Sequence, residues 1–216
     1  MDEYNIKTSD HIVIYGRAGV HFTPRTLFLF KTMGHNTDKI HLLQGSLEEW
    51  ITAGGQIDTT KAVVPVASIL DLESNIRTYA ATDQKNVINM TELLQFVQKG
   101  QVGTGKDVII LDARGSSFAT GHIPGAIHIP YSRLTVSGNS LKFKNKHELM
   151  GLFEQAGVDV FTKRKIVCSC GSGVSVCNLF VALEECGREI DENNTVIYDG
   201  SWAEWSADES TPKSID

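Results

Sequence analysis

The 216-residue sequence lacks any hydrophobic run close to the roughly 18 residues that a membrane-spanning helix needs, so we predict no integral membrane protein. It also lacks an excess of positive charge, because 20 Lys and Arg residues face 26 Asp and Glu residues, for a net charge of −6. This balance disfavours direct binding to nucleic acid or to an anionic membrane surface. The polar, acidic start Met1–Asn5 is unlike a secretory signal or a transit peptide.

Cysteine is scarce, and the four cysteines at positions 168, 170, 177 and 186 lie within 19 residues of one another. A secreted scaffold spreads its cysteines so that disulfides join distant loops, and this cluster therefore indicates a reducing compartment. The spacing C-x-C-x6-C-x8-C has no paired C-x2-C knuckle of the kind that holds structural zinc. We therefore expect no metal and no cofactor.

The sequence does contain an alternation of strand-like and helix-like segments. Continuous apolar runs are typical of strands in a parallel sheet that is covered on both faces, and they occur at 12–15, 108–111, 165–168 and 195–198. Helical patterns that end at a glycine occur at 91–99, 147–156 and 175–186. This alternation predicts an α/β fold with a central parallel sheet flanked by helices.

The sequence also repeats itself. Residues 12–20 (IVIYGRAGV) parallel residues 166–174 (IVCSCGSGV), and residues 42–50 parallel residues 197–205, at offsets of 154 and 155. In each copy an apolar helical segment that ends in glycine lies between the two matches. Three elements in the same order at a nearly constant offset indicate a duplicated domain.

The duplication predicts the domain boundaries. Residues 1–54 form the carboxyl-terminal half of a first copy, residues 55–86 a linker with a short helix near 71–79, and residues 87–206 a complete second copy. The polar residues 207–216 are expected to be a solvated tail. Half a domain leaves sheet edges uncovered, so we expect residues 1–54 to dock on the second copy or to mediate self-association.

The segment Cys170-Gly171-Ser172-Gly173-Val174-Ser175 lies where a predicted strand ends and a predicted helix begins. Two glycines let the backbone curl so that successive N–H groups point at the sulfur, and the helix N-terminus adds positive potential. Both effects favour the thiolate, which is the nucleophilic form of cysteine. We therefore expect an ionised, solvent-exposed sulfur at Cys170. Cys168, Cys177 and Cys186 are expected to be packing residues.

Four motifs occur in order: Asp112-Ala113-Arg114, GHIPGA at 121–126, CGSGVS at 170–175 and YDGSWAEW at 198–205. Their order and spacing resemble the rhodanese family. Within it, the C-G-S-G-V turn resembles the two-domain 3-mercaptopyruvate/thiosulfate sulfurtransferases of the fungal and animal type. The resemblance covers residues 88–206, and residues 1–54 resemble the back half of the inactive N-terminal domain of that family, with Gly16 at the cysteine position.

The resemblance implies transfer of a sulfane sulfur through a persulfide on Cys170. The donor would be 3-mercaptopyruvate or thiosulfate, and the acceptor a thiol, cyanide or a sulfur-carrier protein. The residues that would hold the donor or the persulfide are Gly171, Ser172, Gly173, Val174 and Ser175. For the two serines, turn and helix-cap roles are equally open. Asp112 and Arg114 would brace neighbouring loops through an ion pair, and the protein would act in the cytoplasm or the mitochondrion.

The resemblance leaves the donor open. Mercaptopyruvate enzymes usually carry two substrate-binding arginines between the D-A-R and G-H-I-P-G motifs, where only residues 115–120 stand here. The thiosulfate branch usually has basic residues just after its cysteine, and Gly171 and Ser172 supply none. A catalytically weak interaction module on the same scaffold is therefore a second interpretation. A phosphatase would need an arginine at the position of Val176 to hold the phosphate dianion.

Overall fold

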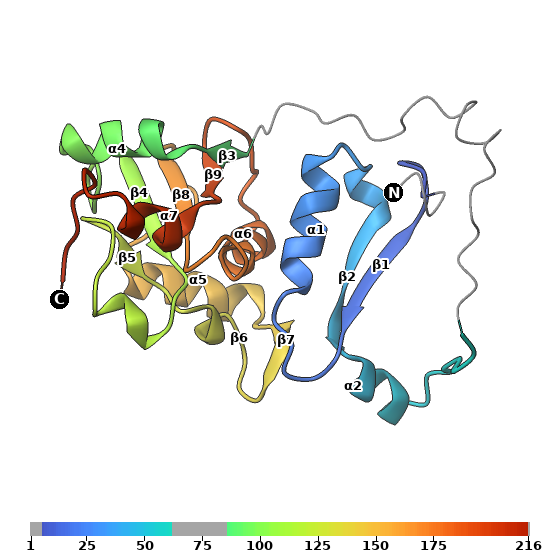
Figure 1. Cartoon of the computed structure of the whole chain (residues 1–216). Helices are drawn as coiled ribbons and strands as arrows, with labels where there is room; N and C mark the ends of the chain where they lie inside the picture. Colours follow the sequence, from blue (N-terminus) through green and yellow to red (C-terminus); the bar gives the residue numbers. More distant parts are fainter. Residues whose placement is uncertain (1–5, 62–85, 216) are drawn as a thin grey trace.

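The computed structural model describes residues 6–61 and 86–215. Within these residues, five parallel strands form the main sheet in the order β3-β9-β8-β4-β5. The strands are β3 (Val87–Ile88), β4 (Val108–Asp112), β5 (Ile127–His128), β8 (Lys165–Ser169) and β9 (Thr195–Tyr198). The helices around this sheet are α4 (Met90–Gln98), α5 (Lys146–Gln155), α6 (Val176–Glu185) and α7 (Ser201–Ala207) (Figure 1). The predicted α/β fold is confirmed.

Two hydrophobic cores flank the sheet, because successive side chains along a strand point to opposite faces. On β8, Ile166 and Cys168 belong to the core that α5 and α6 cover. Val167, between them, belongs to the other core, with Leu93 of α4 and Trp205 of α7. Burial on both faces is the reason why this strand is continuously apolar.

The predicted strands and helices agree with the observed ones to within one residue at each end. The sequence pattern did not indicate the shorter elements. They are the strands β3 and β5, the antiparallel hairpin of β6 (Thr135–Val136) and β7 (Asn139–Phe143), and the 3-10 helices η3 (Ser116–Phe118) and η4 (Tyr131–Arg133). Except for the five-residue β7, each has only two or three residues, too few to show a period in the sequence.

The first copy consists of β1 (Ile12–Gly16), α1 (Thr23–Thr32), β2 (Ile40–Ser46) and α2 (Leu47–Thr52), with the 3-10 helix η2 (Thr37–Lys39) before β2. This is the element order of β8, α6, β9 and α7 in the second copy. In both copies the two strands pair in parallel. The structure therefore repeats the pattern that the offsets in the sequence predict.

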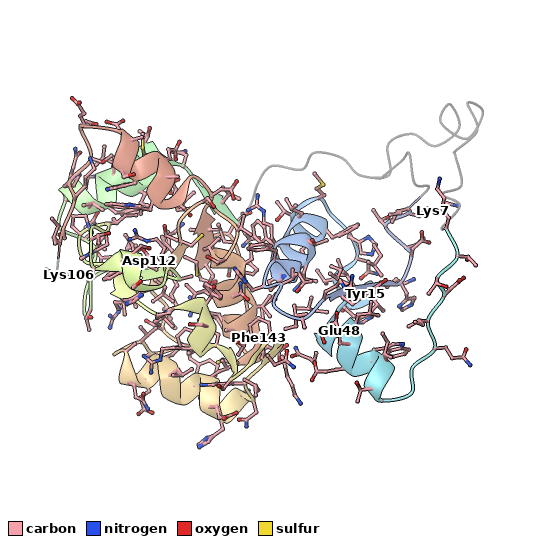
Figure 2. All side chains as sticks on the ribbon, turned by 60° about the horizontal axis from the view of Figure 1, so that its bottom comes forward. Lys7, Tyr15, Glu48, Lys106, Asp112 and Phe143 are labelled. Atoms are coloured by element: carbon pink, nitrogen blue, oxygen red, sulfur yellow. The ribbon has the colours of Figure 1, made fainter. Side chains whose placement is uncertain are left out.

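The first copy docks on the second through α1, which packs against α6 (Figure 1). Phe28 of α1 and Phe180 of α6 meet edge to face, with their ring centroids 5.1 Å apart. At a second contact, the Phe143 N–H of β7 donates to Gln44 Oε1 of β2 at 3.0 Å. Figure 2 shows Phe143 at the junction of the two copies. Apolar residues of both copies belong to one core.

One face of β1 stays uncovered. Val13 and Tyr15 each keep 58% of their surface exposed, whereas Ile14 between them is buried. Tyr15 lies in the first copy, away from the main sheet (Figure 2). Within the described residues, β1 pairs with β2 alone. Half a domain is expected to leave both features exposed, the apolar face of β1 and its second hydrogen-bonding edge.

The end of the chain differs from the prediction of a solvated tail. His122 and Ser214 exchange two backbone hydrogen bonds at 2.9 and 3.0 Å, and Trp205 Nε1 donates to the Pro212 carbonyl at 2.8 Å. Thr211 is buried. The solvated tail is therefore wrong for these residues, because their polar groups find partners on the second copy.

The helix expected near 71–79 and most of the linker lie outside the described residues. Within the described ranges, no helix is long and apolar enough to span a bilayer.

Candidate active site

Cys170 directly follows β8, which lies at the centre of the main sheet. Because β4 and β9 run parallel to β8 on either side, the carboxyl ends of the three strands meet at one edge of the sheet. Asp112 ends β4, while Asp199 and Ser201 follow β9. Ligands of open parallel sheets bind outside this edge. The fold therefore brings the residues from separate motifs to a place suited to binding.

Carbonyl groups of the turn after Cys170 are held by donors from three helices. The N–H groups of Trp202 and Ala203 in α7 donate to the first two carbonyls of the turn, each at 2.9 Å. Arg25 of α1 donates to the Gly173 carbonyl at 3.0 Å. The carbonyls of residues 174 and 175 accept from the backbone of α6 at 3.3 and 3.1 Å.

The N–H groups of the same turn, unlike its carbonyl groups, have no hydrogen-bond partner in the described part of the protein. Across the described part of the chain, none of the six N–H groups from Gly171 to Val176 donates to a protein oxygen or nitrogen. We call these six groups the amide cradle. In a trans peptide the N–H points opposite to the C=O, so five of these N–H groups each point away from the donor that holds the carbonyl of the same peptide. Successive N–H groups without acceptors form an anion-binding nest.

Glycine is required at position 173. Gly173 has a φ of +81°, and a Cβ atom there would lie 2.4 Å from the Asp199 carbonyl oxygen. A side chain would therefore force the turn away from β9. This close approach keeps the curled backbone beside the end of the neighbouring strand.

The sulfur of Cys170 is not exposed, and the prediction of an open thiolate is wrong on this point. Cys170 is 1% exposed and belongs to the hydrophobic core that α5 and α6 cover, and the Trp202 N–H of α7 donates to its carbonyl. Ser201, at a φ of +53°, accepts the Cys170 N–H on its Oγ at 3.1 Å, and this Oγ lies 3.8 Å from Cys170 Sγ. The hydroxyl also donates to the Tyr198 carbonyl at 2.9 Å. The Cys170 thiol is therefore enclosed by protein, with the Ser201 hydroxyl beside it.

The other three cysteines are free thiols in the core. Burial raises the pKa of Cys168 well above its usual range, that of Cys177 to about 12 and that of Cys186 to about 11. Thiols with such pKa values stay protonated at neutral pH and are poor nucleophiles. Their positions are those of packing residues.

A rhodanese-like domain is matched at residues 90–208, which is more than half of the chain. The chain belongs to the rhodanese family. The matched residues include β8, the turn after Cys170 and α7. We therefore call the second copy the rhodanese domain.

Named relatives cover most of the chain. A thiosulfate sulfurtransferase of Gallus gallus is 26% identical over 204 residues, and a 3-mercaptopyruvate sulfurtransferase of Homo sapiens is 28% identical over 204 residues. Each alignment covers 93% of this chain but 65% or 64% of the relative, so the chain spans just under two thirds of their length. The crystal structure of Tum1 protein from Saccharomyces cerevisiae aligns with a TM-score of 0.76 at 24% identity, over 97% of this chain and 70% of that one.

Asp112 and Arg114 form a buried ion pair in the rhodanese domain, with 2.8 Å between Oδ2 and Nη2. Arg114 also donates to the Gly121 carbonyl at 2.9 Å, and its guanidinium carbon lies 4.7 Å from the Trp202 ring centroid. Within the described residues, neither side chain forms a hydrogen bond with Cys170. The pair therefore joins β4 to the loop after it and to α7.

The two serines of the turn differ in environment. Ser172 is exposed on the rim, while Ser175 is partly buried. Ser175 is the N-cap residue of α6, but its side chain forms no capping hydrogen bond. The helix-cap role left open for Ser175 is therefore not realised.

The equivalent turn of the first copy already holds an anion. Glu48 Oε2 accepts the Ala18 N–H at 2.8 Å, and Arg17 Nε lies 3.3 Å from Glu48 Oε1. The hydrogen bond from Ala18 is the main reason why the pKa of the Glu48 carboxyl is lowered to about 2.

The repeat relates this arrangement to the amide cradle. Ala18 corresponds to Ser172 at the offset of 154, and Glu48 corresponds to Ala203 at the offset of 155. In the rhodanese domain the carboxylate is thus replaced by a methyl group, while the N–H groups of the turn remain. The turn of the first copy thus binds a carboxylate through one N–H, whereas the N–H groups of its counterpart in the rhodanese domain have no protein acceptor among the described residues.

Sequence reasoning assigned no role to Ser201 and did not find the contact of Arg25 with the turn. Ser201 stands in the YDGSW motif just after β9. Because β9 is predicted to run parallel to β8, the residues that follow the two strands lie at the same edge of the sheet, and the position of Ser201 near Cys170 could have been inferred from this. The Arg25 contact depends on how α1 docks on α6, and the only signal for it was the repeat.

Proposed function

We propose that this protein is a sulfurtransferase that carries sulfane sulfur as a persulfide on Cys170. The donor is thiosulfate or 3-mercaptopyruvate, and the acceptor is a thiol, cyanide or a sulfur-carrier protein. Four free cysteines suit a reducing compartment, for which the cytoplasm and the mitochondrion are the two candidates.

The amide cradle is the observation that carries this proposal. None of these six successive N–H groups donates to a protein acceptor in the described chain, and successive N–H groups of a curled turn suit an anionic ligand. A thiolate, a persulfide and the oxygens of a thiosulfate or carboxylate are all such anions. The cradle begins at the residue after Cys170, so it favours negative charge on and around that sulfur.

The chemistry has two halves. In the first, the Cys170 thiolate attacks the outer sulfur of thiosulfate or the thiol sulfur of 3-mercaptopyruvate, a new S–S bond forms, and the leaving group takes the electron pair of the broken bond. With thiosulfate the broken bond is S–S and sulfite leaves. With 3-mercaptopyruvate the broken bond is C–S, and the thiol proton ends on the methyl group of pyruvate. In the second half an acceptor anion attacks the terminal sulfur, and the Cys170 thiolate is released.

The named relatives support both donors, since one is called a thiosulfate and the other a 3-mercaptopyruvate sulfurtransferase. The site itself favours neither, because Arg25 and Arg114 are engaged by Asp199 and Asp112. The burial of Cys170 adds a requirement for either donor. The donor must reach a sulfur that is 1% exposed, so residues that cover Cys170 have to move when it binds.

Turnover with cyanide tests the proposal. Purified protein is given thiosulfate or 3-mercaptopyruvate with cyanide, and thiocyanate is measured. We expect thiocyanate with at least one donor, no turnover in Cys170→Ser and full turnover in the matched control Cys186→Ser, whose thiol lies at the far end of α6. No thiocyanate from either donor, or turnover that survives Cys170→Ser, would refute the assignment.

The burial of Cys170 favours one second candidate, a rhodanese-like interaction module whose cysteine does no chemistry. The two functions predict different results in the same assay. A module gives no thiocyanate with any donor, and its Cys170→Ser variant binds its partners as the unaltered chain does.

A further inference from the structure

Arg25 links the first copy to the turn of the rhodanese domain. Its Nη1 donates to the Gly173 carbonyl at 3.0 Å, and its guanidinium pairs with both carboxylate oxygens of Asp199. The side chain of Arg25 keeps 24% of its surface exposed. We propose that Arg25 is a positioning residue that sets the conformation of the Cys170 turn for persulfide formation, a role that rests on the proposed function.

The peptide group between Gly173 and Val174 transmits this effect. Its C=O and N–H point in opposite directions, since the described chain has no cis peptide bond. Because Arg25 holds the carbonyl oxygen, the Val174 N–H points away from Arg25, to the side of the amide cradle. Gly173 is one of the two glycines that let the turn curl, so an anchor at this peptide restricts the conformation of the turn.

Asp199 holds Arg25 from the side of the rhodanese domain. A guanidinium presents several donors in one plane, so a single arginine can bind a carboxylate and a carbonyl together. The same Asp199 backbone limits the space beside Gly173, because its carbonyl oxygen would lie 2.4 Å from a Cβ atom there. Arg25 and Asp199 therefore clamp the turn between α1 and the end of β9.

This contact gives the first copy a part in the reaction. Gly16 stands where the rhodanese domain has Cys170, so the first copy carries no sulfur of its own. It contributes a cation to the turn of the other copy instead.

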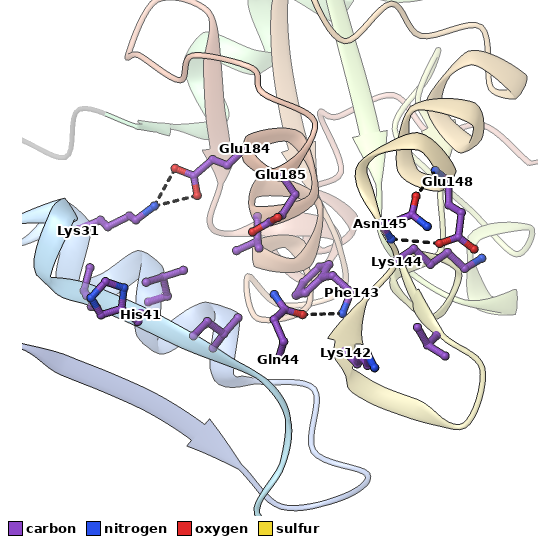
Figure 3. A pocket seen from close by; sticks show the side chains of 15 residues that line it. Lys31, His41, Gln44, Lys142, Phe143, Lys144, Asn145, Glu148, Glu184 and Glu185 are labelled. Carbon is purple, nitrogen blue, oxygen red and sulfur yellow. Dashed lines mark hydrogen bonds and ion pairs between the residues drawn. The ribbon is translucent and has the colours of Figure 1, made fainter. Parts of the chain in front are cut away.

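Lys31 supplies a matched control on the same helix. Its Nζ pairs with Glu184 of α6 at 2.7 and 2.8 Å, and its side chain is 22% exposed, close to the value for Arg25. Figure 3 shows this pair at the rim of a pocket between the two copies. Glu184 lies at the carboxyl-terminal end of α6, whereas the turn after Cys170 lies just before the amino-terminal end of this helix. Lys31→Ala therefore removes an ion pair between the copies without touching the turn.

The test compares Arg25→Ala, Arg25→Lys and Lys31→Ala with the unaltered chain in the cyanide assay. For Arg25→Ala we expect kcat to fall about tenfold to a hundredfold with KM changed little, because a misplaced reacting group slows the chemical step. We expect Arg25→Lys to retain part of the rate. Millimolar guanidinium chloride restores part of the rate of Arg25→Ala, whereas sodium chloride at the same concentration does not. Lys31→Ala stays close to the unaltered chain and does not respond to guanidinium.

A second measurement needs no sulfur donor. Iodoacetamide modifies cysteines, and fragment-ion mass spectrometry gives the rate at Cys170, which we expect to fall about tenfold in Arg25→Ala. If the unaltered chain makes no thiocyanate but this rate falls, the proposed function fails and the positioning role stands. Equal rates in Arg25→Ala and Lys31→Ala, or a loss in KM alone, overturn the positioning role. If Arg25→Ala does not fold, Asp199→Asn removes the charge that holds Arg25 in place and decides by the same criteria.

Discussion

Replacing Ala203 by glutamate tests whether the turn after Cys170 binds anions. In the first copy the counterpart Glu48 carries a carboxylate that accepts the Ala18 N–H at 2.8 Å. Ala203 lies beside the turn, since its N–H donates to the Gly171 carbonyl at 2.9 Å, and its side chain is exposed. We therefore expect the carboxylate of Ala203→Glu to occupy N–H groups of the amide cradle that an anionic donor would use.

The size of the effect follows from the contact that forms. A hydrogen bond to a charged group contributes about 1.5–3 kcal/mol, and about 1.4 kcal/mol corresponds to a factor of ten in binding. Because residue 203 is exposed, solvent screening favours the lower end of this range. We expect KM for thiosulfate to rise about tenfold and kcat to change less, because the carboxylate competes with the free donor.

The assay is steady-state thiocyanate formation with thiosulfate varied. The neutral variant Ala203→Gln is the matched control, since it has the same shape without the charge, and we expect it to stay within about twofold of the unaltered chain. An unchanged KM in Ala203→Glu would refute the reasoning. An equal rise in both variants would show that volume, and not charge, closes the turn.

Three other predictions concern stability and assembly. Arg188 donates to four carbonyls and to Thr195 Oγ1, at 2.6–3.2 Å, so Arg188→Ala should lower the free energy of unfolding by about 3–5 kcal/mol in urea titrations. Burial raises the pKa of the Cys177 thiol to about 12 in the folded chain, whereas an unfolded cysteine has a pKa of about 8.5. Between these two values the unfolded chain therefore binds fewer protons than the folded chain does. This contribution to stability is complete below pH 8.5 and is lost as pH rises towards 12, and Cys177→Ala should remove about 1.4 kcal/mol per pH unit from the decline between pH 9 and 11. We also propose self-association through the uncovered face of β1, so the chain should sediment as a concentration-dependent dimer and Tyr15→Lys as a monomer.

Each of these predictions has a contradicting result. An Arg188→Ala variant that unfolds at the same urea concentration would mean that the four carbonyls find water instead. An identical pH slope with and without the Cys177 thiol would show that this group does not titrate on unfolding. A chain that sediments as a monomer at every concentration would remove the proposed role of β1.

Three of the five strands of the main sheet, β4, β8 and β9, were predictable because they are buried on both faces. A strand such as β8 then needs an unbroken apolar run, and the glycine that ends the following helix marks the next boundary. The packing of the chain end was not predictable. Polar residues such as Thr211 and Ser214 occur both in solvated tails and in tails that pack on a domain. The difference depends on partners that are distant in the sequence, such as His122, which no local pattern shows.

The site was predictable as far as local backbone chemistry determines it. The strand, the two glycines and the helix place Cys170 and the amide cradle, and this is visible in six consecutive residues. The burial of the sulfur depends on Ser201, whose φ of +53° no local pattern indicates for a serine. The clamp by Arg25 depends on tertiary docking of α1, and sequence periodicity carries no information about that contact.

A mass measurement on the donor-treated protein, without any acceptor, tests the central claim most directly. Trypsin leaves all four cysteines in the peptide 166–188, so fragment ions have to locate the modification. We predict a gain of one sulfur atom on Cys170 with thiosulfate or 3-mercaptopyruvate. No gain with either donor, or a sulfur on Cys168, Cys177 or Cys186 instead, would contradict the account.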